Sequence, residues 1–157
     1  MLYDLEERVE DALVAYLESV VTGDMRVYPA WSDESVQYPC AVVHAGSSDA
    51  VSAEAEWSLP RQMGVEITVH TDAAPELDSD GNTRRTARER NAAIRSDVIK
   101  AFSTATLKSL VIAAAGPGVA FSMVQLGGPM VRTVDEERRT LITTIPVDVI
   151  AEPVEVA

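Results

Sequence analysis

The chain has 157 residues, 46% of them hydrophobic and 24% charged, and its 25 Asp and Glu residues outnumber 13 Lys and Arg residues, for a net charge of -12. A chain of this size buries roughly 70% of its unfolded surface, so we expect one soluble domain, residues 1–157. No apolar run approaches the roughly 20 residues of a membrane span, and the acidic N-terminus is unlike a secretory signal. Cys40 is the only cysteine, which excludes an intrachain disulfide and fits a reducing cytoplasm.

The first element that the sequence predicts is an amphipathic helix over residues 4–21. Apolar residues recur there at helical spacing, from Leu5 to Val20, and most of the acidic residues lie off that stripe. Asp4 and Glu7 form a variant of the capping box, and Gly23 follows the helix as a stop signal.

Three strands are expected next, over residues 25–29, 40–45 and 57–70, and residues 46–56 between the last two read as an exposed acidic loop. The third segment alternates most clearly, with Val65, Ile67 and Val69 on one face. Residues 73–82 contain Pro75 and Gly81 and break regular structure.

A second helix is expected over residues 83–103, capped by Asn82 or Thr83. Its inner face is marked by Ala87, Asn91, Ile94, Val98 and Phe102. Glycine turns bracket a strand over residues 119–126, residues 107–115 are ambiguous, and residues 139–150 alternate as a closing strand. The fold class is therefore α+β, of order α-β-β-β-α-β-β, with a mainly antiparallel sheet and both helices on one face.

The length of the third strand has a consequence for assembly. Residues 57–70 would extend about 45 Å as one strand, whereas a compact domain of this size has a radius of gyration of about 15 Å. Such a strand overhangs its domain, and its unpaired edge favours pairing with a neighbouring chain. The alternative is a bulge or kink near residues 60–64 that divides the stretch into two ordinary strands.

The residues that could form a catalytic or metal-binding site are explained better by structural roles. Cys40, His44, His70 and Asp49 are the residues from which a nucleophile and its base could be built, but no nucleophile motif accompanies them. Residues 78–89 place oxygen ligands at positions 1, 3, 5 and 12 of a calcium loop, yet Thr83 stands where that loop needs glycine. A solvated turn explains the same residues, and we expect no metal, cofactor or catalytic residue.

Five arginines gather at the start of the second predicted helix, where Arg84, Arg88 and Arg95 would share one face. Phosphate contacts, a solvated face with local ion pairs, and pairing with acidic segments of an adjacent subunit, such as residues 49–56 or 76–80, all remain open. The acidic net charge opposes nucleic acid. The candidate interface residues are Arg84, Arg85, Arg88, Arg95, Trp57, Glu54 and Glu56.

The order of these elements, with three strand motifs, resembles the tail terminator (tail completion) proteins of long-tailed bacteriophages over nearly the whole chain. The motifs are Arg26-Val27-Tyr28-Pro29, Tyr38-Pro39-Cys40-Ala41-Val42-Val43 and Gly64-Val65-Glu66-Ile67-Thr68-Val69, and the strand over residues 141–150 closes the pattern.

This resemblance implies a virion protein of the tail or neck, without enzymatic activity, that is assembled in the host cytoplasm. Family members form a ring, usually a hexamer, that caps the finished tail tube, ends its polymerisation and offers the docking surface for the head connector. The partners implied are further copies of the chain, the tail tube protein and a head-completion protein. Genomic DNA would pass through the lumen without specific binding, and a charge of about -72 for six copies fits that role.

Two other functions remain open at this stage. Another neck component, such as a head-closure or connector protein, shares the small α+β design. A small cytoplasmic enzyme or ligand-binding protein would use His44, His70 and Asp49 and would lose its activity when these residues are replaced by alanine.

Overall fold

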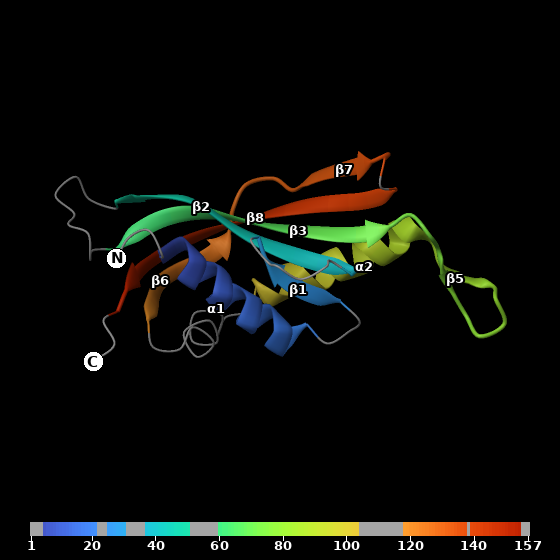
Figure 1. The fold of residues 1–157 in the computed structure, drawn as a ribbon, viewed down its shortest axis with the longest axis horizontal. Helices are drawn as coiled ribbons and strands as arrows, with labels where there is room; N and C mark the ends of the chain where they lie inside the picture. Colours follow the sequence, from blue (N-terminus) through green and yellow to red (C-terminus); the bar gives the residue numbers. More distant parts are fainter. Residues whose placement is uncertain are drawn as a thin grey trace.

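The frame of the protein is a six-stranded sheet with two helices on one of its faces (Figure 1). The computed structural model describes residues 5–21, 25–30, 37–50, 60–103, 118–137 and 139–154, with the backbone alone at residues 47–50 and 76. The helices are α1, Leu5–Val20, and α2, Ala87–Ala101. The strands are β1 Arg26–Pro29, β2 Cys40–Ala50, β3 Arg61–Asp72, β4 Glu76–Leu77, β5 Thr83–Arg85, β6 Val119–Leu126, β7 Val131–Asp135 and β8 Thr140–Pro153.

The main sheet has the strand order β1-β2-β3-β8-β6, and β7 pairs with β8. Strand β1 runs parallel to β2, and all other neighbours are antiparallel. β6 pairs with residues 147–153 of β8 and β7 pairs with residues 140–144, so the two strands follow one another along β8. β4 and β5 form a separate hairpin. The predicted α+β class and its mainly antiparallel sheet are confirmed.

Alternating sequence explains the central strands and the core. Val65, Ile67 and Val69 of β3 are buried beneath the helices. The alternate residues of β8 are buried in the same layer, Ile145, Val147 and Val149 among them. Because successive side chains of a strand point to opposite faces, this alternation gives the sheet one apolar face.

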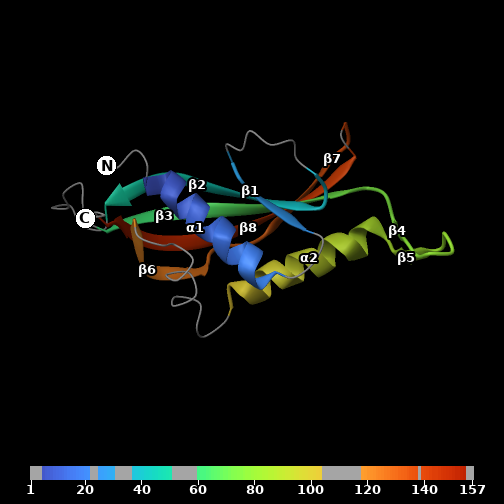
Figure 2. The same ribbon diagram turned by 60° about the horizontal axis from the view of Figure 1, so that its bottom comes forward.

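Both helices cover that apolar face, α1 next to β1 and β2, and α2 next to β3 and β8 (Figures 1 and 2). The stripe of α1 that the sequence predicts is buried from Leu5 to Leu17. The Tyr16 hydroxyl donates a hydrogen bond to the Ala101 carbonyl, and the Tyr16 ring meets Phe102 edge-on at a centroid distance of 5.6 Å. These contacts join the two helices over the sheet.

Strand β2 is longer than the sequence predicts. Residues 46–50 were expected in an exposed loop, but they continue β2 after a shift of register with β3 between Ala45 and Ser48. A Cβ at Gly46 would approach the Gly64 carbonyl oxygen to 3.2 Å, so glycine allows the strands to stay close at this irregularity. β3 itself is continuous from Arg61 to Asp72, so the alternative of a division near residues 60–64 is wrong for the described part of that strand.

The start of the second helix also differs from the prediction. Thr86, not Asn82 or Thr83, is the N-cap, and its hydroxyl oxygen accepts a hydrogen bond from the Glu89 backbone amide at 3.2 Å. The Thr86 hydroxyl in turn donates to the Glu89 carboxylate at 3.1 Å, so the pair forms a variant of the capping box with a side-chain bond in place of the usual bond to the cap amide. Residues 83–85 form β5, which pairs with β4 across a turn where Gly81 has φ 81°.

Several expectations concern residues outside the described ranges. They include the Asp4 cap, the Gly23 stop, the ambiguous residues 107–115, and the side chains of Trp57, Glu54 and Glu56.

Candidate functional site

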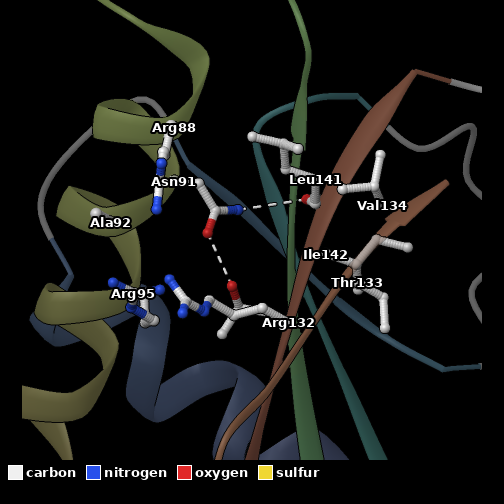
Figure 3. A pocket seen from close by; sticks show the side chains of 10 residues that line it. Arg88, Asn91, Ala92, Arg95, Arg132, Thr133, Val134, Leu141 and Ile142 are labelled. Carbon is white, nitrogen blue, oxygen red and sulfur yellow. Dashed lines mark hydrogen bonds between the residues drawn. The ribbon is translucent and has the colours of Figure 1, made fainter. Parts of the chain in front are cut away.

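A cleft of about 450 Å³ lies between α2 and the strand pair β7–β8 (Figure 3). Helix α2 contributes one wall, and β7 and β8 contribute the other. Its lining combines positive charge with apolar surface and comprises Arg88, Asn91, Ala92, Arg95, Arg132, Thr133, Val134, Leu141, Ile142 and Thr143.

Asn91 holds the two walls together. It is 5% exposed, and its side-chain amide donates to the Thr71 hydroxyl at 3.0 Å and to the Leu141 carbonyl at 3.3 Å. The Thr143 hydroxyl donates to the Asn91 side-chain oxygen at 2.8 Å. These bonds connect α2 with β3 and β8, and they satisfy polar groups that would be costly to bury unpaired. These hydrogen bonds therefore fix the position of α2 relative to the strands that line the cleft.

Three guanidinium groups line the cleft. Arg88 and Arg95 are seven residues apart on α2 and share its face, and Arg132 extends toward them from β7 (Figure 3). Within the described part of the chain, none of these three arginines makes a hydrogen bond or an ion pair. Each guanidinium group offers five donors in a planar fork suited to carboxylate or phosphate. The cleft is thus built to attract an anionic group.

The other arginines of the sequence cluster lie elsewhere. Arg84 and Arg85 are on β5, so the prediction of a helical face shared by Arg84, Arg88 and Arg95 is wrong for Arg84. Arg90 lies outside the cleft lining and pairs with Asp72 at 3.1 Å. Of the expected interface residues that the structure describes, Arg88 and Arg95 line the cleft, whereas Arg84 and Arg85 lie together on β5 outside its lining.

Sequence reasoning missed Arg132 and the polar base of the cleft. Arg132 stands in β7, a five-residue strand whose first four residues are all exposed, so the strand lacks the alternation of apolar and polar residues by which a strand is recognised. Asn91 was expected on the inner face of the helix, which its burial confirms, but its partners come from strands 20 and 52 residues away. No local pattern carries that information.

Three of the four candidate catalytic residues, Cys40, His44 and His70, have side chains that the structure describes. Cys40 and His70 are opposite one another in the β2–β3 register, but burial raises the pKa of the Cys40 thiol to about 11, so the thiol stays protonated at neutral pH. His70 shares a 2.9 Å hydrogen bond with the Thr68 hydroxyl. His44 lies exposed opposite Glu66, four residues along β2 from Cys40. The side chain of Asp49 lies outside the described set.

The suspected calcium loop is a hydrogen-bonded turn in the structure. One carboxylate oxygen of Asp78 accepts hydrogen bonds from the backbone amides of Asp80 and Asn82, both at 2.9 Å. Across the described residues, no group of three or more His, Cys, Asp or Glu side chains is arranged to hold a metal ion. Likewise, no helix in the described ranges has the length and apolar character needed to cross a membrane.

Comparison with known proteins finds similarity among solved structures alone. No family model matches the chain, and no curated protein matches it. Among solved structures, a chain from the virion of a native gene transfer agent (GTA) particle is similar with 15% sequence identity and a TM-score of 0.44. The likeness covers 94% of this chain and 94% of that one. Similarity at this level does not establish a family.

Proposed function

We propose that this chain is a structural subunit of a phage-like virion, namely a tail terminator. In this role it caps the tail tube as a ring, ends tube polymerisation and presents the surface on which the head joins. The observation that carries the proposal is the order and pairing of the elements: an N-terminal helix over β1 and β2, a long β2–β3 hairpin, a second helix, and β8 as the closing strand beside β3. This order is the one that the sequence resemblance implies.

The sheet supports the proposal through its second face, since both helices pack on the other one. On the second face, His44, Gln62 and Glu66 are exposed, and their neighbours on β8, such as Pro146 and Ile150, are partly exposed. The strands behind this face are long, with 12 residues in β3 and 14 in β8, or about 40 and 46 Å. Such a surface suits contacts with neighbouring subunits or with the tube.

Charge supports the same role. Six chains of charge -12 would surround a lumen with the sign of the DNA phosphates, which favours passage of the genome over its retention.

The direct test adds purified protein to growing tail tubes and images them by electron microscopy. A terminator stops elongation and is found, by gold labelling, at one end of each tube. Deletion of its gene from the phage-like genome that encodes it should yield overlong tubes without heads. Expression of the protein from a separate copy of the gene should restore the normal tube length. Label on the head portal with tube length unchanged would instead identify a head-closure protein and would contradict the proposal.

A further inference from the structure

The β4–β5 hairpin projects from the body of the molecule as an arm, which we define as residues 76–85. It extends beyond the N-terminal end of α2 and away from the sheet in both views (Figures 1 and 2). Leu77 is 56% exposed, and every residue from 77 to 84 is exposed. An isolated two-stranded hairpin is marginally stable in water, so an arm of this kind gains stability when a partner covers it.

The tip of the arm presents a defined negative charge. The Asp78 carboxylate holds the turn by accepting two backbone hydrogen bonds. The Asp80 carboxylate makes no hydrogen bond or ion pair within the described residues, and it is exposed. The turn therefore orders the backbone around an acidic group that is available to a partner.

The arginine cleft complements this tip. It offers the guanidinium groups of Arg88, Arg95 and Arg132, while the neighbouring Val134 is 63% exposed and provides an apolar wall. The Asp80 carboxylate has the charge opposite to that of the guanidinium groups, and Leu77 on the same arm offers an apolar side chain for contact with Val134. An arm that points away from its own body does not occupy the cleft of its own chain.

We propose that the arm of one copy of this chain inserts its acidic tip into the arginine cleft of a second copy. The contact is heterologous, because the arm of one subunit meets the cleft of the next. Repeated contacts of this type close into a ring or continue as an open filament. The inference rests on the proposed function, since it identifies the contact that builds the terminator ring.

Arginine–carboxylate chemistry explains why this contact is specific. A guanidinium group binds a carboxylate through two parallel hydrogen bonds, and the cleft removes part of the surrounding water. Nucleic acid would also bring anions to the cleft, but it would have to approach a chain of charge -12.

Cysteine cross-linking tests the contact, because the native Cys40 is buried and does not interfere. The paired variant carries Ser79→Cys on the arm, which leaves the Asp80 carboxylate in place, and Ala92→Cys in the cleft. On mild oxidation we expect a ladder of cross-linked species on a non-reducing gel, whereas an equimolar mixture of the two single variants gives dimers at most. A matched control pairs Ser79→Cys with Ser122→Cys, an exposed residue of β6, and gives no ladder. Absence of a ladder in the paired variant would overturn the proposal.

Charge reversal gives an independent test by analytical ultracentrifugation. Asp80→Arg and Arg95→Glu should each weaken self-association by at least about 10-fold, and the double variant should recover it, because the reversed charges attract again. Far-UV circular dichroism checks that each variant is folded. If the wild-type ring forms and both single variants assemble equally well, the arm contact is overturned while the terminator function stands.

Two further results would also overturn the contact. If the wild-type chain stays monomeric alone and on tail tubes, both the arm contact and the proposed ring are wrong. If Arg95→Glu abolishes binding of a short DNA duplex while self-association is unchanged, the cleft serves nucleic acid and not a second copy.

Discussion

Glu10 illustrates how a single buried acid is tolerated in the core. Its carboxylate accepts a hydrogen bond from the Ala45 backbone amide at 2.8 Å and joins α1 to β2 next to the register shift. Burial raises the pKa of this carboxyl above its ordinary value of 4.5. The hydrogen bond from Ala45 and the charge of His44 oppose that shift, because each lowers the pKa. Asp11 and Glu7 add smaller repulsive contributions.

Replacing Glu10 by glutamine should make stability less dependent on pH. Because its pKa is raised in the folded state, protonated Glu10 contributes stability that is present below pH 4.5 and lost as pH rises through the raised pKa. The glutamine side chain cannot ionise, and its carbonyl oxygen can still accept the hydrogen bond from Ala45. Urea unfolding should therefore show a gain in unfolding free energy for Glu10→Gln over wild type that grows as pH rises from 4.5 through the raised pKa. Glu7→Gln, at an exposed position of the same helix, serves as control. A gain in unfolding free energy for Glu10→Gln that is equal at every pH would contradict this account.

Asn91 supports the cleft through three hydrogen bonds to buried or backbone groups. Asn91→Ala should lower the free energy of unfolding by about 2 to 4 kcal/mol, because Thr71 and Thr143 lose buried partners. Ser96→Ala, at an exposed position of the same helix, should change it by less than about 0.5 kcal/mol. Denaturant unfolding measures both variants, and equal effects would show that the Asn91 bonds do not stabilise the fold.

At the scale of elements, the cap of α2 separates the helix from the arm. Thr86→Ala removes the hydroxyl that accepts from the Glu89 amide, so it should cost about 1 kcal/mol of stability. Thr83→Ala changes an exposed residue of the arm and should cost less. Thermal unfolding compares the two variants. A larger loss for Thr83→Ala would contradict the placement of the helix start at Thr86.

Strong periodicity made most elements predictable. β6 has the predicted bounds, and α1 and β8 differ from prediction by three residues or fewer at each end, since long alternating or helical stretches carry their signal in many positions. β4, β5 and β7 were missed because each has five residues or fewer and, among the side chains that the structure describes, shows no buried face. The misplacement of Arg84 followed from this, since nothing local distinguished a polar hairpin from the first turn of a helix.

The cleft was only partly predictable for a related reason. Arg88 and Arg95 share a helical face by spacing alone, so their proximity could be read from the sequence. Arg132, Leu141 and Thr143 join them through the pairing of β7 with β8, which is tertiary information.

At the scale of the whole molecule, the proposed assembly would explain the acidic charge, the exposed arm and the arginine cleft together. An excess of acidic residues makes separate subunits repel one another, and in the proposed contact the exposed arm and the arginine cleft would offer opposite charges. We therefore expect self-association to weaken as salt rises, because exposed ion pairs are screened. Sedimentation at increasing salt concentration measures this effect. An association that strengthens with salt would point to a mainly apolar contact.

The native mass of the purified protein tests the central claim most directly. Native mass spectrometry over a range of concentrations, with negative-stain imaging of the main species, is the appropriate measurement. A closed hexameric ring of this 16.9-kDa chain has a mass of about 101 kDa, and the account predicts this species alone or on addition of tail tubes. A stable dimer that does not change when tubes are added would contradict it.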